Sequence, residues 1–127
     1  MSNNTGYSNK YSGEVLLHKL KKYAVKIGVK LVYVALLLYY TLQKENIPLK
    51  AKAIIIGSLG YFIAPLDIIT DLLPLIGYSD DFGVLLMALA TVAMYIDNEV
   101  KNKAQLKLRS WFGTINEREI SKIHAKL

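Results

Sequence analysis

The chain of 127 residues contains no cysteine and only two histidines, His18 and His124. Without cysteine there is no disulfide, no thiolate nucleophile and no zinc site built on thiolates. We expect both histidines to be solvated helix residues rather than metal ligands, because neither lies in a pattern of other ligand residues. These absences remove several familiar kinds of catalytic and metal centre, and no catalytic residue is assigned.

Lysine and arginine are absent between Lys52 and Lys101, although the whole chain has a formal net charge of +6. The basic residues are therefore concentrated toward the two ends of the sequence. A basic surface attracts nucleic acid or anionic lipid, and the apolar middle of this chain favours lipid. We expect an anionic membrane surface as the partner, and no nucleic acid.

Long hydrophobic runs are missing too, even though hydrophobic residues make up 53% of the sequence. The uncharged stretches 31–42, 53–66 and 82–96 contain twelve, fourteen and fifteen residues. A helix that spans a bilayer requires about 20 apolar residues. Stretches of the length found here are typical of buried core helices, interfacial segments or re-entrant hairpins.

The sequence patterns predict an all-α fold, a small bundle of about four to five helices arranged around a central helical hairpin. Residues 1–12 are polar and are expected to be a flexible arm. We assign 13–112 to one helical domain and 113–127 to a basic helical tail, which a capping-box pattern over 116–119 opens.

Apolar residues recur at steps of three and four from Leu16 to Leu42, which predicts a long first helix. This helix is amphipathic at first and apolar nearly all round from Leu31. The pattern is equally consistent with one helix and with two helices that are broken near Gly28. Lysines occupy another face of its first half, and we expect them to face lipid; they are Lys19, Lys22, Lys26 and Lys30.

The central hairpin is predicted from proline and capping signals. We expect one helix over 48–64, ended or kinked by Pro65, then a short helical turn over 67–73. A second helix is expected to start at Ser79 and run to about Phe112. If the two pair, lysines gather at the open end of the hairpin, namely Lys50, Lys52, Lys101 and Lys103.

Four aspartates mark the turn of this hairpin. Asp67 and Asp71 share a helical face, and the turn brings Asp80 and Asp81 back toward them. Three roles stay open: capping of helix starts, ion pairs with lysines of the first helix, and a site for a hard cation such as Mg²⁺ or Ca²⁺. Prolines, glycine and tyrosine shape the same turn, namely Pro65, Pro74, Gly77 and Tyr78.

At this turn the sequence resembles the YkvA-like family, the domain of unknown function 1232. The resemblance covers about residues 15–112, and one departure is Thr70, where members commonly have proline. It implies a small bacterial protein that is associated with a membrane and has no established activity. Ten residues in fixed order carry it: Tyr61, Pro65, Asp67, Ile69, Asp71, Pro74, Gly77, Tyr78, Asp80 and Asp81.

These observations favour a non-enzymatic, membrane-associated helical protein. Its basic surface would face anionic lipid, and its acidic turn would face a partner or a divalent cation. The expected location is the bacterial inner membrane or its cytoplasmic face. One alternative is a soluble helical interaction domain that buries its apolar surplus by forming a homo-oligomer, and a second is a carboxylate-dependent metal hydrolase.

Overall fold

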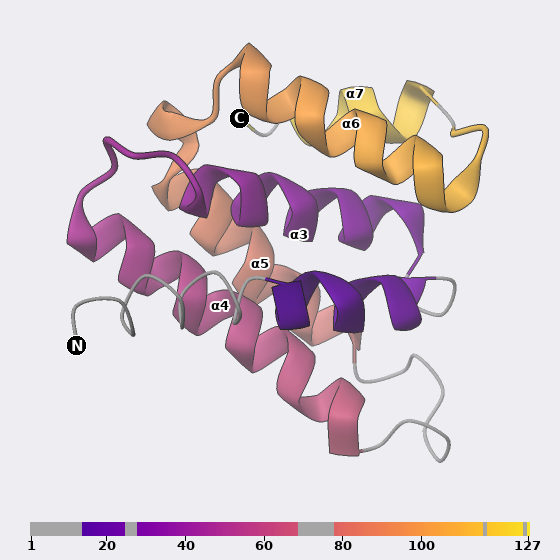
Figure 1. Cartoon of the computed structure of the whole chain (residues 1–127), viewed down its shortest axis with the longest axis horizontal. Coiled ribbons are helices and arrows are strands. Elements are labelled where there is room, and N and C mark those ends of the chain that lie inside the picture. The colour runs from indigo at the N-terminus through magenta and orange to yellow at the C-terminus, as the bar shows by residue number, and fades with distance from the viewer. Residues whose placement is uncertain (1–13, 25–27, 69–77, 116, 126) are drawn as a thin grey trace.

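The structure is a computed structural model that describes residues 14–24, 28–68, 78–115, 117–125 and 127, without the side chains of 64–68, 78–82 and 119. This part of the chain is helical and contains no strand, which confirms the predicted all-α class (Figure 1). The helices are residues 14–22, α3 (Val29–Leu42), α4 (Leu49–Ile68), α5 (Tyr78–Thr91), the 3₁₀ turn η2 (Ala93–Tyr95), α6 (Asn98–Phe112) and α7 (Glu117–His124).

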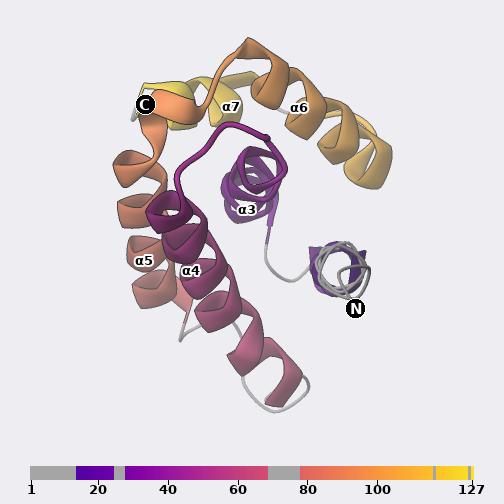
Figure 2. The same ribbon diagram turned by 60° about the vertical axis from the view of Figure 1, so that its left-hand side comes forward.

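Helix α3 is the centre of the bundle, because every side chain from Val32 to Leu38 is fully buried. Helices α4 and α5 pack against one side of it, and α6 and α7 against another (Figure 2). The stretch that is apolar all round is therefore surrounded by protein. Burial of a leucine or isoleucine side chain stabilises a fold by about 1.5–3 kcal/mol, so this core dominates stability.

The helical pattern of the first forty residues is divided at Gly28. This residue has φ +96° and ψ 158°, a backbone conformation that residues with a side chain rarely adopt. Residues 14–22 and α3 are consequently separate helices, so the alternative with a break is the correct one. Gly113, with φ +76°, ends α6 in a similar way, and its N–H donates to the Arg109 carbonyl at 2.7 Å.

Two predicted helix boundaries are wrong. Helix α4 does not end before Pro65 but continues to Ile68. Pro65 therefore does not end the helix, whereas the alternative that it kinks the helix, by removing one backbone hydrogen bond and crowding the preceding turn, stays a prediction. The second helix of the hairpin ends at Thr91 rather than near Phe112, because η2 and a new helix follow it.

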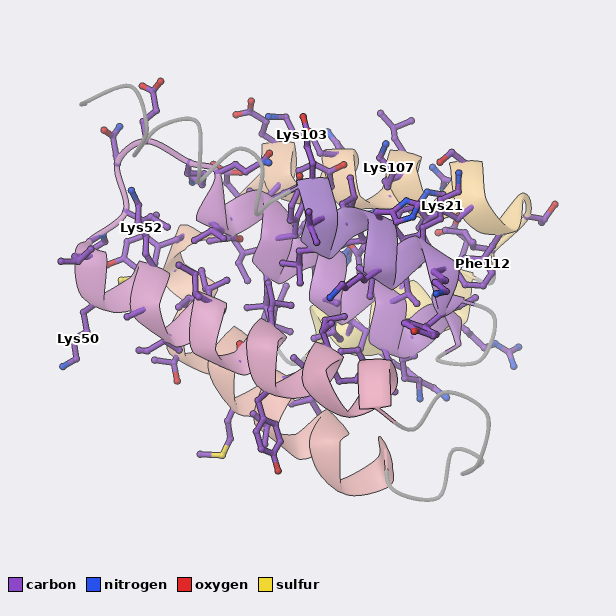
Figure 3. All side chains as sticks on the ribbon, turned by 60° about the horizontal axis from the view of Figure 1, so that its bottom comes forward. Lys21, Lys50, Lys52, Lys103, Lys107 and Phe112 are labelled. Carbon is purple, nitrogen blue, oxygen red and sulfur yellow. The ribbon has the colours of Figure 1, made fainter. Side chains whose placement is uncertain are left out.

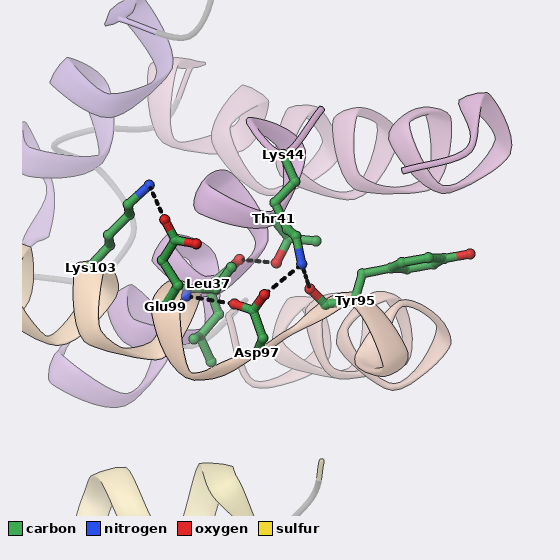
Figure 4. A network of polar contacts seen from close by, with 8 residues as sticks. Leu37, Thr41, Lys44, Tyr95, Asp97, Glu99 and Lys103 are labelled. Atoms are coloured by element: carbon green, nitrogen blue, oxygen red, sulfur yellow. Dashed lines mark hydrogen bonds and ion pairs between the residues drawn. The ribbon is translucent and has the colours of Figure 1, made fainter. Parts of the chain in front are cut away.

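The start of α6 is fixed by a polar network that the sequence analysis overlooked (Figure 4). Asp97 caps the helix, since its Oδ1 accepts a hydrogen bond from the Val100 N–H at 3.0 Å. Lys44, in the loop after α3, donates to Asp97 Oδ2 at 2.8 Å and to the Tyr95 carbonyl at 2.9 Å. The Lys44 hydrogen bond, and after it the Val100 bond, lowers the pKa of Asp97.

As a result, α6 turns back over α3 instead of prolonging the hairpin. Lys101 and Lys103 belong to α6, and Lys103 lies away from Lys50 and Lys52 (Figure 3). The expectation that these lysines gather at one end of a hairpin is therefore wrong for Lys103. Its local partner is Glu99, one helical turn earlier, at 3.5 Å.

Candidate functional site

The most unusual surface of the molecule is the exposed side of the α4–α5 pair. Its large apolar side chains are mostly in water: Met87 is 74% exposed and Ile56 57%, and Met94 of the turn η2 that follows α5 is 82% exposed. Exposed positions recur at helical spacing on both helices, so each contributes a continuous stripe. We call this surface the hairpin face; it comprises Leu49, Ala53, Ile56, Gly57, Gly60, Tyr61, Gly83, Met87, Ala90, Thr91 and Met94.

The two stripes lie on neighbouring elements of one layer. Helices α4 and α5 pack against each other, and both pack against α3 through their opposite sides (Figure 2). Ile55, Leu59 and Leu85 form those inner sides and are buried. Each helix is therefore apolar on its inner and on its outer side, whereas a helix at a water-facing surface normally has a polar outer side.

Charge is absent from the hairpin face. No residue in 53–63 or in 83–96 is charged. One of its two hydroxyl groups bonds to its own helix, because Thr91 Oγ1 donates to the Met87 carbonyl at 2.7 Å, whereas the phenol of Tyr61 is exposed. The polar groups of the face are therefore few and uncharged.

Cationic side chains border the face at the start of α4. Lys50 is exposed and Lys52 half-buried, and both extend from the same end of the molecule (Figure 3). The exposed phenol of Tyr61 lies three turns further along α4. Tyrosine and lysine at the edges of an apolar surface are typical of the region where lipid headgroups meet water.

Three helical glycines on the face have open space beside them in the described part of the molecule. A methyl group added at Gly57, Gly60 or Gly83 would meet no heavy atom within 4 Å other than those of its own helix backbone and chain neighbours. Glycine inside a helix is about 1 kcal/mol less favourable than alanine. Packing among the described residues therefore does not explain these glycines.

The four aspartates of the predicted turn are only partly within the described residues. Asp67 lies in the last turn of α4, and Asp80 and Asp81 lie in the first turn of α5. The last turn of α4 and the first turn of α5 belong to one helical hairpin, as predicted from the sequence. Asp71, Pro74 and Gly77 are outside the described residues, and Pro65 and Tyr78 belong to α4 and α5.

The described part of the chain contains neither a membrane-spanning helix nor a cluster of metal ligands. No helix there is both long enough and apolar enough to cross a membrane. Among the side chains that the structure describes, no three histidine or acidic residues are grouped so that they hold a metal ion. The cation role of the aspartates, whose side chains fall outside that set, stays a prediction.

In a comparison with known families, one family model matches the hairpin. Residues 51–87 match the family model of the protein of unknown function DUF1232. This match confirms the resemblance to domain of unknown function 1232 over a narrower range than 15–112. Comparison with curated proteins and with solved structures gave no match.

The DUF1232 match thus covers most of α4, the acidic turn and the first part of α5. It includes Ile56, Tyr61 and Met87 of the hairpin face. The match carries no activity with it, so the physical character of this surface is the main guide to function.

The lysines predicted to face lipid do not form one stripe of one helix. Lys19 and Lys22 belong to the helix over 14–22, whereas Lys30 belongs to α3 beyond the break at Gly28. Lys22 is exposed, with its Nζ 5.5 Å from the centre of the Tyr23 ring, and Lys19 and Lys30 are half-buried. Lys26 lies outside the described residues, and a lipid contact of these lysines stays a prediction.

Sequence reasoning missed the hairpin face as a site, although its signal is present. The outward positions of α4 and α5 carry no charged side chain over 53–63 and 83–91, so these stretches lack the charged side that a surface helix normally has. The expectation that His124 is a solvated residue is wrong, since it is half-buried and its Nε2 lies 2.7 Å from the Tyr33 hydroxyl. His18, by contrast, is exposed as expected.

Proposed function

We propose that this chain is a non-enzymatic peripheral membrane protein that docks on anionic lipid through the hairpin face. The observation that carries the proposal is the exposure of large apolar side chains on two adjacent helices without any charge among them. Contiguous apolar surface of this kind marks sites for lipid or protein partners. The membrane we expect is the bacterial inner membrane, at its cytoplasmic face.

Lipid fits this surface better than water for energetic reasons. Transfer of a side chain such as Ile56 or Met87 into an apolar medium is favourable by about 1.5–3 kcal/mol. Lys50 and Lys52 would remain at the level of the phosphate groups, where each basic residue adds about 1 kcal/mol. Helices α4 and α5 would then lie in the plane of the interface rather than across the bilayer.

The proposal is tested by vesicle co-sedimentation of the full chain. Vesicles of phosphatidylglycerol mixed with phosphatidylcholine are compared for the wild type and for the double variant Ile56→Gln/Met87→Gln. The variant is expected to bind at least tenfold more weakly, because two apolar anchors are lost. The matched control is Leu106→Gln on α6, a leucine that is 67% exposed but lies outside the hairpin face.

Two results of the vesicle assay would contradict the proposal. Equal loss in Leu106→Gln and in the double variant would mean general adsorption and would reject the assigned face. Absence of vesicle binding by the folded wild type would reject the function itself. Circular dichroism shows that each variant retains its helical content before binding is compared.

The lysine contribution is measured in the same assay. Lys50→Gln/Lys52→Gln is expected to weaken binding to anionic vesicles roughly tenfold or more and to leave binding to neutral vesicles unchanged. The lysines predicted from the sequence are tested by Lys19→Gln/Lys22→Gln. A larger effect of that pair would shift the basic contact from α4 to the helix over 14–22.

Self-association is a second candidate, and the glycines favour it. Small residues on a helix allow close approach of another helix, and Gly57, Gly60 and Gly83 open onto the hairpin face. Sedimentation velocity without lipid distinguishes this candidate. A stable oligomer that Ile56→Gln/Met87→Gln converts to monomer would assign the face to a second copy of the chain instead of to lipid.

A further inference from the structure

A second feature of the molecule has no part in lipid docking. Tyr33 of α3 is fully buried, and its hydroxyl oxygen lies 2.7 Å from His124 Nε2 of α7 and 3.3 Å from Gln105 Nε2 of α6. The Tyr33 and His124 rings are tilted by 50° with centroids 5.8 Å apart. We call these three residues the Tyr33 cluster; it joins three helices through one buried oxygen.

The hydrogen bonds of the cluster are complete in the neutral form of His124. The amide nitrogen of Gln105 has no acceptor capacity, so it donates to the Tyr33 oxygen. When His124 carries its proton on Nδ1, its Nε2 accepts the single hydroxyl hydrogen of Tyr33 across the 2.7 Å contact.

The surroundings of His124 also favour its neutral form. Partial burial is the main reason that the pKa of His124 is lowered, the positive charge of Lys101 on α6 lowers it further, and the negative charge of Glu117 on α7 opposes both. Burial also raises the pKa of Tyr33, so its hydroxyl keeps the proton that the bond requires.

Helix α7 is short and relies on packing against the rest of the molecule for its stability. It has eight residues, which is too short for a helix to be stable by itself in water. Ile120 and Ile123 bury its inner side, and an exposed ion pair between Arg109 and Glu117, 3.1 Å long, joins its start to α6. Exposed ion pairs contribute little to stability.

We propose that His124 makes the docking of α7 pH-sensitive: protonation of Nε2 removes the acceptor of the buried Tyr33 hydroxyl, and α7 leaves α3. A protonated Nε2 is a donor facing an oxygen that already accepts from Gln105. The hydroxyl hydrogen of Tyr33 then has no acceptor inside the cluster. Opening of α7 returns these groups to water and exposes the apolar side formed by Ile120 and Ile123.

The direction with pH follows from the lowered pKa. When α7 is open, His124 titrates near its ordinary value of 6.5, and when α7 is docked it titrates below that value. Docking is therefore fully stabilised above pH 6.5 and is weakened as the pH falls below it. Between the two pKa values, the ratio of open to docked α7 rises up to about tenfold for each pH unit.

The experiment is an NMR titration of the full chain between pH 7.5 and pH 5.0, with labelled histidine rings and isoleucine methyl groups. We expect the ring nitrogens of His124 to report the Nδ1–H form at pH 7.5 and a pKa below 6.5, the ordinary value of histidine. The Ile120 and Ile123 methyl signals should change with the same midpoint, whereas those of Ile55 on α4 should not. Hydrogen exchange is expected to show faster opening of 117–124 at the lower pH.

Two variants decide the assignment. His124→Gln is expected to remove the pH dependence of α7, and the matched control His18→Gln is expected to retain it. A pKa of His124 at or above 6.5, or the same pH dependence in His124→Gln, would overturn the proposal. If His124→Gln does not fold, the wild-type titration still decides, because it requires no variant. Vesicle binding plays no part in this readout, so the result is independent of the proposed function.

Discussion

The two layers that cover α3 are built in opposite ways. The α6–α7 layer has a polar exterior, a capped helix start at Asp97 and a buried hydrogen-bond cluster around Tyr33. The α4–α5 layer has an apolar exterior, with no charged residue in 53–63 or 83–96. Both layers bury isoleucine or leucine against the same central helix.

This difference indicates what each layer is for. Polar groups of the α6–α7 layer have partners elsewhere in the chain, since Asp97 bonds to Lys44 in the loop after α3 and Gln105 bonds to Tyr33 of α3. The hairpin face is left without a partner in the described part of the molecule, and hydroxyls such as that of Thr91 bond only to their own helix. The polar bonds of the α6–α7 layer stabilise the fold, whereas the hairpin face of the α4–α5 layer is the surface to which the proposed lipid docking is assigned.

The largest expected effect distinguishes the two sides of α4. Ile55→Ala should lower the free energy of unfolding by about 2–5 kcal/mol, because Ile55 is fully buried. The neighbouring Ile56 is 57% exposed, so Ile56→Ala should change the free energy of unfolding by no more than about 0.5 kcal/mol. Chemical denaturation measures both, and similar losses would mean that the hairpin face is packed after all.

The Asp97 network tests the polar layer. Asp97→Ala should lower stability by about 1–2 kcal/mol through loss of the helix cap, and Asp97→Asn by less because asparagine also caps. The ion pair with Lys44 is partly exposed, with side chains 30% and 49% exposed, so its charge should add less than the cap. Urea denaturation at pH 7 measures these differences, and equal losses in the two variants would assign the effect to charge instead of capping.

The same carboxylate gives a signed pH dependence. The pKa of Asp97 is lowered from 3.8 in the folded state, so its contribution is complete above pH 3.8 and is lost as the pH falls through the folded value. Asp97→Asn should lack this component when stability is followed between pH 5 and pH 2. Retention of the full wild-type slope would show that other carboxylates produce it.

Glycine substitutions should have opposite signs in different parts of the chain. Gly57→Ala and Gly60→Ala should each raise stability by about 0.5–1 kcal/mol, because the added methyl groups enter open space in a helix. Gly28→Ala should lower it, because the φ of +96° disfavours a side chain. Thermal denaturation of the monomer measures both, and a loss at Gly57 would indicate a helix of another chain packed there.

The smallest effect concerns the acidic turn. Asp80→Asn in the first turn of α5 should lower stability by about 0.3–1 kcal/mol, because a negative charge is favourable at a helix N-terminus. If the aspartates act as caps, the loss is the same with and without millimolar Mg²⁺ or Ca²⁺. Ion-dependent stabilisation that disappears in Asp67→Asn/Asp71→Asn would instead assign a cation site.

The sequence predicted the helical class and the hairpin correctly because these depend on local signals. The period of apolar residues indicated helices, and Gly28 was recognised as a possible break. The division of 82–112 into two helices was not predicted, because the helical pattern of the sequence continues through the turn between α5 and α6. That turn is fixed by Lys44, which is distant in sequence from Asp97 and Tyr95.

The candidate site was predicted only in outline. The absence of basic residues between Lys52 and Lys101 and the apolar surplus both indicated an unusual surface. Which residues form it depends on packing, since Ile55 and Ile56 are identical side chains with opposite environments. The environment of His124 also depends on packing, because its neighbour Tyr33 is 91 residues earlier in the chain.

The sequence by itself determined that this protein is helical, free of thiol chemistry and apolar in its middle, because composition and period are local properties. Tertiary structure decided which apolar side chains α3 removes from water and which stay exposed. It also decided that α6 returns over α3 and that a histidine meets a buried tyrosine. These outcomes depend on contacts between residues far apart in the chain, and no local pattern encodes them.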